Sequence, residues 1–312
     1  MPKQPRDRVM RDVAVRGSDP ELAAARDFWQ LPDHELDQLL ALSVEADRVE
    51  LKLAVPEHAH DATCAALGVG FARVPVNQVY YLDTEDRALH RHGVVVRVRS
   101  VGRRPDDSVI KLRPVMPDGI PAALRQSKQF VVEIDGMPGS YVCSGALKAR
   151  LGVHDVERAM ARRRPLRGLF SKPQLRLLAA HLPRQAGIDD LVIVGPVDAR
   201  RRKLVPNGLG RALLVEQWTF PDDSRILELS TRCPPDAAMR VAAQMAVVLR
   251  AYGVDLTGPQ QTKTRATLDF FSTRAESPRT NDKRHRRGDL GKRHLSARQA
   301  MSRDGVSGPR AS

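Results

Sequence analysis

Cysteine, aromatic side chains and long apolar runs are all scarce in this chain of 312 residues. The three cysteines, at positions 64, 143 and 233, are too scattered for a zinc ribbon or a redox pair, and they argue against a disulfide framework. No stretch approaches the roughly 20 apolar residues of a membrane span, and the N-terminus lacks an apolar signal segment. We therefore expect a cytoplasmic protein with no membrane partner.

Two kinds of site are also missing from the sequence. The G-x-x-x-x-G-K-[ST] motif of P-loop enzymes is absent, which excludes that class of phosphate-binding protein. Histidines occur in i,i+2 pairs, His58 with His60 and His90 with His92, but no carboxylates accompany them at a recognisable spacing. We interpret these histidines as ordinary surface residues rather than as metal ligands.

What the chain has is positive charge and enough apolar residues for a core. Hydrophobic residues make up 42% of the sequence, sufficient for one large domain or two ordinary ones, and the net charge is +14. Residues 273–312 carry much of this charge but almost no aliphatic side chains, so we expect a disordered basic tail. Its KRHRR run could contact nucleic acid or polyphosphate, although most such runs are simply solvated.

Turn-forming residues divide the rest of the chain into short elements. Residues 1–46 predict an N-terminal extension, loose up to residue 17, then helical, with a break at Leu31-Pro32-Asp33. Helices are also predicted at 56–70, at 155–163 and 174–181 within an insertion near 145–186, and at 234–253. Strands are predicted at 48–53, 78–84, 93–100, 108–115, 127–135, 190–195, 199–205, 211–220 and 225–231.

Charged and apolar residues alternate along several of these strands. In RVELKL, at 48–53, the charged residues at 48, 50 and 52 share one face and the aliphatic residues share the other. The same pattern occurs at 94–100, 109–115, 130–135 and 225–230. In an open sheet the charged face would meet water, whereas a sheet that closes into a barrel would gather these faces in a wet interior. Charges there need carboxylates, water or an anionic ligand, because a buried unpaired charge costs several kcal/mol.

The mixture of charges indicates a metal-bound polyphosphate as the ligand. Arginine offers planar, forked donors that match phosphate oxygens, and lysine acts as a point charge. Carboxylates hold hard divalent cations such as Mg²⁺ or Mn²⁺, which can bridge to phosphate. A network of salt bridges without any ligand is the alternative. Trp218, Tyr80 and Tyr81 are expected to brace the barrel, although an aromatic ring at its mouth could stack on a base.

Seven segments in order resemble the CYTH domain of the triphosphate tunnel metalloenzymes, which include class IV adenylate cyclases, thiamine triphosphatases and inorganic triphosphatases. The segments are VELKL (49–53), QVYYLDTEDRALHRHGVVVRVRS (78–100), VIKLRP (109–114), VVEID (131–135), LLVEQWTF (213–220), ILELS (226–230) and TKTRATL (262–268). The resemblance implies an α+β fold: a closed or nearly closed eight-stranded antiparallel β-barrel, forming a tunnel within residues 47–272, with flanking helices.

The resemblance also implies the residues of the site. Carried over by position, the residues expected to bind the substrate are Lys52, Arg97, Arg99, Lys111, Arg113, Arg201, Lys203 and Lys263, and the first four of these are the catalytic candidates. The expected ligands for Mg²⁺ or Mn²⁺ are Glu50, Glu133, Glu216 and Glu228. In the ARRRKLV segment the inward-facing set stays open between Arg200 with Arg202 and Arg201 with Lys203.

One departure from the family pattern leaves the function open. Arg48 stands where the family's opening ExExK motif has its first glutamate, and a basic side chain there removes an oxygen ligand and repels a cation. The leading hypothesis is a metal-dependent phosphohydrolase acting on inorganic triphosphate, a nucleoside triphosphate or another small molecule that carries a triphosphate. The alternatives are a class IV-type adenylate cyclase and a catalytically impaired module that binds polyphosphate or a nucleotide.

Overall fold

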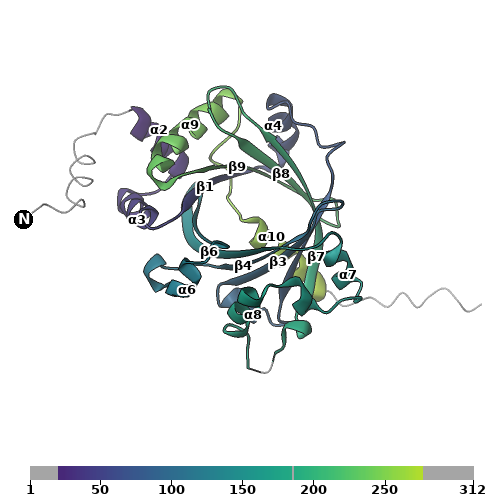
Figure 1. Ribbon diagram of the computed structural model, residues 1–312. Coiled ribbons are helices and arrows are strands. Elements are labelled where there is room, and N and C mark those ends of the chain that lie inside the picture. The colour runs from purple at the N-terminus through teal and green to yellow at the C-terminus, as the bar shows by residue number, and fades with distance from the viewer. Residues whose placement is uncertain (1–19, 185, 277–312) are drawn as a thin grey trace, which may run out of the picture. The chain divides into compact units, whose positions relative to one another are not determined.

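The computed structural model describes residues 20–184 and 186–276 (Figure 1). The loose segment expected at 1–17 and most of the basic tail expected at 273–312 lie outside these ranges. Within the described ranges no helix combines the length and the apolar character that a membrane crossing requires. The barrel and its helices belong to one compact unit that extends to Arg274.

Nine strands close into a barrel, in the order β1-β5-β6-β4-β3-β2-β7-β8-β9 and back to β1. They are β1 (Arg48–Val55), β2 (Asn77–Asp83), β3 (Val94–Ser100), β4 (Asp107–Leu112), β5 (Phe130–Met137), β6 (Ser140–Arg150), β7 (Val192–Leu204), β8 (Leu213–Thr219) and β9 (Arg225–Cys233). Figure 1 looks into the barrel, with helices around its outer wall. The predicted α+β class and closed barrel with flanking helices are confirmed.

The expected count of eight strands, all antiparallel, is wrong. Strand directions can alternate all the way around a closed ring only when the number of strands is even. With nine strands at least one neighbouring pair must therefore run parallel. That pair is β1 with β5, whose register sets Arg48 opposite Glu133 and Glu50 opposite Asp135; the other neighbours are antiparallel.

Two sequence interpretations of individual elements also fail. Residues 145–150, assigned to a helical insertion, belong to strand β6, which pairs with both β4 and β5. The segments at 190–195 and 199–205, read as two strands, form the single long strand β7, which continues through Gly195-Pro196 with a register shift against β2. Proline and glycine mark an irregularity in the pairing here rather than the end of the strand.

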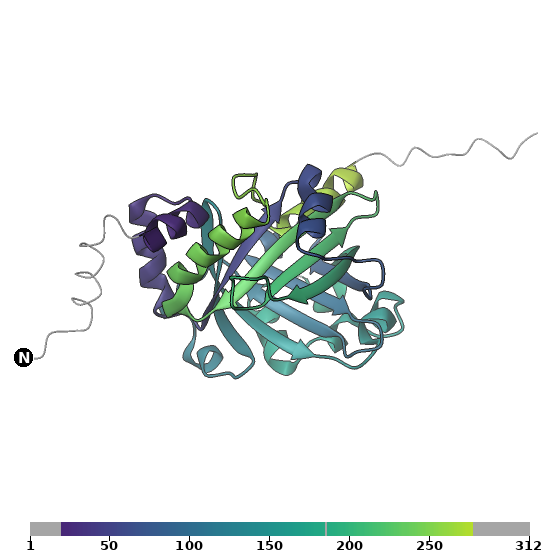
Figure 2. The same cartoon turned by 90° about the horizontal axis from the view of Figure 1, so that it is seen from above.

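The described helices are α2 (Pro20–Trp29), α3 (Asp33–Ser43), α4 (His60–Ala66), α5 (Ala88–Arg91), α6 (Ala122–Arg125), α7 (Asp155–Met160), α8 (Lys172–Ala179), α9 (Ala238–Ala251) and α10 (Lys263–Glu276). The expected break before Asp33 separates α2 from α3. The first four residues of the expected disordered tail, 273–276, are instead the last turn of α10. Figure 2 shows α9 lying alongside the N-terminal helices, and α9 packs on α2.

Aliphatic side chains on the outer face of the barrel form the main core with these helices. Leu51, Leu53, Leu227 and Leu229 are fully buried in it, as the alternation predicts. The indole ring of Trp29 lies directly over Gly136 of β5, and a Cβ at Gly136 would come within 2.3 Å of it. Only glycine allows α2 to pack this closely on the outer face of β5. The charged side chains of the same strands point the opposite way and line the interior.

A second apolar cluster lies at one end of the barrel interior, where α10 packs. It joins inward-facing side chains of β2, β3, β7 and β8, including Tyr81, Val95 and Trp218, with Leu268 of α10. The Tyr81 hydroxyl lies 3.3 Å from the Thr264 hydroxyl and links β2 to the start of α10. The expectation that Tyr81 and Trp218 brace the barrel agrees with this packing, and α10 itself was not predicted.

Replacing Leu268 with alanine should lower the free energy of unfolding by about 2–5 kcal/mol, because the change opens a void where α10 meets the barrel. Leu268 is 3% exposed. Urea denaturation followed by circular dichroism measures the loss. The matched control is Val247→Ala on α9, at a side chain that is 58% exposed, which should change stability by less than about 0.5 kcal/mol. Equal effects of the two substitutions would mean that α10 does not pack as described.

Candidate functional site

The barrel interior holds a cavity of about 530 Å³ lined mainly by charged side chains. Nine basic residues line it: Lys52, Arg97, Arg99, Lys111, Arg113, Lys148, Arg201, Arg232 and Lys263. Six acidic residues line it as well: Glu50, Asp107, Glu133, Asp135, Glu216 and Glu228. With all of them ionised, the wall carries three positive charges in excess, which favours a ligand with several negative charges.

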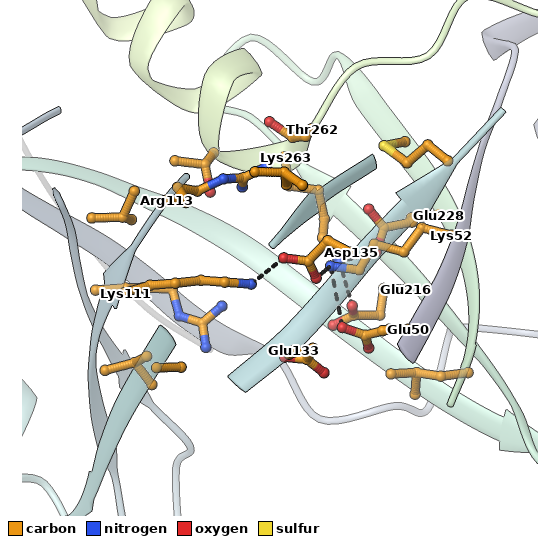
Figure 3. Close-up of a pocket in the computed structure, with 18 of the residues that line it drawn as sticks. Glu50, Lys52, Lys111, Arg113, Glu133, Asp135, Glu216, Glu228, Thr262 and Lys263 are labelled. Carbon is orange, nitrogen blue, oxygen red and sulfur yellow. Dashed lines mark hydrogen bonds and ion pairs between the residues drawn. The ribbon is translucent and has the colours of Figure 1, made fainter. Parts of the chain in front are cut away.

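The register of β1 with β5 brings three buried carboxylates together. Glu50, Glu133 and Asp135 each offer an oxygen within 4.8 Å of the other two. Lys52 Nζ lies 2.6 Å from Asp135 Oδ1 and 3.1 Å from Glu50 Oε2, and Lys111 contacts the other oxygen of Asp135 (Figure 3). This acidic cluster of Glu50, Glu133 and Asp135 is thus held by lysines from two strands, β1 and β4.

Ion pairing decides the protonation of the acidic cluster. Burial raises the pKa of Glu50 and of Asp135, but nearby cations outweigh burial, so both pKa values lie below the ordinary range, that of Asp135 far below. Burial lowers the pKa of Lys52, yet Asp135 and Glu50 together raise it well above normal. For Lys111 burial outweighs the attraction of Asp135, and its pKa is lowered. Glu50 and Asp135 are therefore ionised at neutral pH.

A second pair of carboxylates faces Lys263 at the start of α10. Glu216 and Glu228 lie directly opposite each other on β8 and β9. Two like charges so placed would repel, but Lys263 Nζ lies 2.6 Å from Glu228 Oε1 and also contacts Glu216, which pairs with Arg201 as well. Lys263 lies 5.2 Å from the centre of the Trp218 ring. The N-terminus of α10 is thereby fixed against the barrel wall.

Three of the cations have no such partner. Among the described residues, no carboxylate lies within ion-pair distance of Arg97, Arg113 or Lys148. Arg97 Nε is buried and has no hydrogen-bond acceptor in the described part of the chain. Burial lowers the pKa of Lys148, Glu133 raises it, and the charges of Arg48, Arg232 and Arg97 lower it, with a net pKa of about 8. A bound anion would relieve this local excess of positive charge.

Eleven of the twelve site residues expected from the sequence line the same cavity, and their roles there stay predictions. Lys203 does not line it, and this side chain is exposed. For the ARRRKLV segment the structure selects Arg201, which contacts Glu216, as the inward-facing arginine. Lys203 lies on the same face of β7 as Arg201, but it is outside the cavity, one residue before the end of the strand.

Sequence reasoning missed four charged residues of the cavity, namely Asp107, Asp135, Lys148 and Arg232. Asp135 alternates with Glu133 in the VVEID segment, so the strand period could have identified it. Arg232 continues the Glu228, Ser230 alternation by two residues beyond the matched motif. Lys148 carried no usable signal, because its segment was assigned to a helical insertion and not to β6.

The structure gives Arg48 and one histidine environments that the sequence did not indicate. Arg48 Nε donates to Glu133 Oε1 at 2.8 Å, so the side chain faces the acidic cluster rather than solvent. His60, expected at the surface, is 2% exposed, and its Nε2 lies 2.9 Å from the Val55 carbonyl oxygen. The surface interpretation is therefore wrong for His60, whose ring is buried at the first residue of α4.

The acidic cluster is a donor set that could hold a metal ion. Its oxygens are hard ligands of the type that Mg²⁺ and Mn²⁺ prefer, and they lie close enough to share one ion. Of the four expected ligands, Glu50 and Glu133 belong to this cluster, whereas Glu216 and Glu228 do not. Asp135, which was not expected, takes the third place. The residues therefore fit a divalent cation, with a ligand set that differs from the predicted one.

Comparisons with known proteins support the fold. No family model matches the chain, and no curated protein matches its sequence. Among solved structures the chain is similar to an adenylyl cyclase candidate from Hippeastrum, described as having a dominant triphosphatase activity, with 15% identity over 71% of this chain and 95% of that one and a TM-score of 0.50. An adenylate cyclase candidate from Bacillus halodurans aligns at 12% identity over 71% and 97% of the chains, with a TM-score of 0.49. At such identities the likeness concerns the fold alone.

Replacing Lys148 with glutamine should flatten the pH dependence of anion binding. The pKa of Lys148 is near 8, and a bound polyanion favours the protonated amine, so binding takes up a proton and weakens as the pH rises through about 8. Calorimetric titration of inorganic triphosphate from about pH 6.5 to about pH 9.5 measures the effect, and titration of the ligand itself is common to both proteins. Lys172→Gln, at an exposed lysine of α8, should follow the unmodified protein. Identical profiles for all three proteins would contradict this role of Lys148.

Proposed function

We propose that this protein binds a linear triphosphate group in the barrel and hydrolyses a phosphoanhydride bond with the help of a divalent cation. One observation carries the proposal: nine cations and six carboxylates converge on one cavity, and three of the cations lack a carboxylate partner among the described residues. Arg97, Arg113 and Lys148 are half-buried, and a protein that used these charges only for stability would be expected to pair them, because a charge that loses solvent without gaining a partner is unfavourable. The excess supports an anionic ligand.

The unpaired cations of the cavity and the acidic cluster suit different parts of this chemistry. Arg97, Arg113 and Lys148 are free to donate to phosphate oxygens and to neutralise the charge that develops on them. The acidic cluster would hold the divalent cation, which supplies charge neutralisation and polarises a phosphoryl oxygen when bound. Phosphoryl transfer needs mainly positioning and charge stabilisation, so a nucleophilic Ser, Cys or His is not required.

The position of α10 supports a short ligand. Thr262, Lys263 and Thr264 line the cavity at the start of α10, and Trp218 of the apolar cluster lines it as well. A long polyphosphate threaded through the barrel would meet α10, whereas a terminal triphosphate need not extend that far. We therefore favour inorganic triphosphate or the triphosphate end of a small molecule over a long polymer.

A binding protein without turnover is the second candidate, and the ion pair between Arg48 and Glu133 favours it. The guanidinium lies 2.8 Å from a carboxylate oxygen of the acidic cluster, where a cation would otherwise bind. Such a protein would still bind a triphosphate through Arg97, Arg113 and Lys148. It would lack only the cation that assists cleavage.

Substituting Arg97 by glutamine should weaken binding of inorganic triphosphate by about 10- to 150-fold, because a hydrogen bond to a charged group contributes about 1.5–3 kcal/mol. Calorimetry in Mg²⁺ measures the dissociation constants. Arg91→Gln removes the same charge from an exposed arginine that pairs with Asp86, and it should leave the affinity within about twofold of that of the unmodified protein. If both variants bind like the unmodified protein, the cavity is not the binding site.

Turnover should be detected with at least one of inorganic triphosphate, thiamine triphosphate and ATP in Mg²⁺ or Mn²⁺, and Glu50→Gln should abolish it by removing a ligand of the cation. Assays for phosphate, pyrophosphate and cyclic AMP separate hydrolysis from cyclisation. Glu57→Gln, at an exposed residue, is the matched control and should retain full activity. Tight binding with no product from any substrate would support the second candidate.

A further inference from the structure

The acidic cluster is already surrounded by positive charge in the absence of any metal. Four cationic side chains contact its three carboxylates: Lys52, Lys111 and Arg232, which line the cavity, and Arg48. Five of the six carboxylate oxygens lie within 3.1 Å of a cationic nitrogen. The carboxylates are therefore neutralised in full by the protein itself.

The two arginines are placed by the barrel's own register. Arg232 of β9 lies opposite Glu50, and its Nη2 is 2.8 Å from Glu50 Oε1 while its Nε is 3.5 Å from Glu133 Oε1. Arg48 lies opposite Glu133 on the neighbouring strand and contacts the same Glu133 oxygen. Arg232 thus bridges the two glutamates, and Arg48 contacts Glu133, across three adjacent strands, β9, β1 and β5.

Arginine differs here from the lysines in one decisive property. A guanidinium stays charged at any pH at which the protein is folded, whereas a buried lysine can lose its proton. A divalent cation must approach carboxylate oxygens to about 2.0–2.6 Å, which is closer than either guanidinium now lies. At Glu50 Oε1 and Glu133 Oε1 it would compete with Arg48 and Arg232 for the same oxygens, against the repulsion of their charges.

We infer that Arg48 and Arg232 are built-in counter-ions of the acidic cluster, which compete with a divalent cation for Glu50 and Glu133 and keep its affinity low. This inference deepens the proposed function, since the same carboxylates are proposed there to hold the cation. Arg48 Nη2 is buried and has no acceptor among the described residues. A triphosphate could engage the guanidiniums, release the carboxylates and so make cation binding depend on the anion.

Titration with Mn²⁺ alone, followed by the loss of the free-ion electron paramagnetic resonance signal, tests the competition without any substrate. The double variant R48Q/R232Q should bind one Mn²⁺ at least about tenfold more tightly than the unmodified protein, because two like charges are removed from the site. Adding Glu50→Gln to the double variant should remove the gain. The double variant R91Q/R250Q changes two exposed arginines, paired with Asp86 and Asp27, and should behave like the unmodified protein.

Thermal unfolding gives a second readout and a check that the variants fold. Without the two guanidiniums Glu133 has no cationic partner among the described residues, so R48Q/R232Q should melt at a lower temperature and recover stability with Mn²⁺ more than the unmodified protein does. Should the double variant not fold, Arg232→Gln alone, at a side chain that is 51% exposed, should still gain at least about threefold in Mn²⁺ affinity, because one of the two like charges is removed.

A variant that binds Mn²⁺ no more tightly than the unmodified protein overturns the inference, whether both bind well or neither does. That outcome is separate from the fate of the proposed function. Inorganic triphosphate titrated against the unmodified protein in EDTA and in Mg²⁺ tests the cavity itself. Absence of triphosphate binding in both buffers would refute the proposed function while leaving the Mn²⁺ result valid.

Discussion

The structure depends on charge neutralisation inside a closed barrel. Alternation along the strands buries one set of side chains against the helices and forces the other set inward, where water is limited. Arg, Lys, Asp and Glu can share that space only if opposite charges meet, since each unpaired buried charge costs several kcal/mol. The register of the barrel places opposite charges together: Glu50 lies opposite Arg232, and Glu133 lies opposite Arg48. Fold and site are therefore determined by the same pairing of strands.

The sequence was sufficient to predict the alternation of side chains within most strands, but not the number and direction of the strands in the barrel. Period-two alternation located most strands and the inward faces of β1, β3, β4 and β5, because side-chain direction within a strand is a local property. Strand number and direction are global. The segment at 140–150 is poor in the bulky branched residues that identify strands, and so β6 and its Lys148 were missed. The eight-stranded antiparallel barrel, which the family resemblance implied, is wrong in strand number and in the direction of one pair.

Membership of the acidic cluster shows the same limit at the level of single residues. Four carboxylates were expected to act together, and each does face the cavity. Which of them lie near one another depends on register: the parallel pairing of β1 with β5 joins Glu50, Glu133 and Asp135, whereas the pairing of β8 with β9 joins Glu216 to Glu228. No periodicity within one strand carries that information. Which residues of ARRRKLV face inward likewise became clear only from the strand that pairs with β7, because Arg201 contacts Glu216 of β8.

Ion pairing that stabilises a charged interior conflicts with the requirements of the proposed catalysis. Stability favours internal pairs that satisfy every carboxylate, as Arg48 and Arg232 do for Glu50 and Glu133. Catalysis needs carboxylates that are free to take a cation and cations that are free to meet phosphate. In this barrel different residues meet the two requirements. The acidic cluster is paired with counter-ions, whereas Arg97, Arg113 and Lys148 have no carboxylate partner among the described residues and could bind phosphate. A triphosphate that recruits the guanidiniums would move the balance from the first state toward the second, because it offers them new partners in the same step that frees the glutamates.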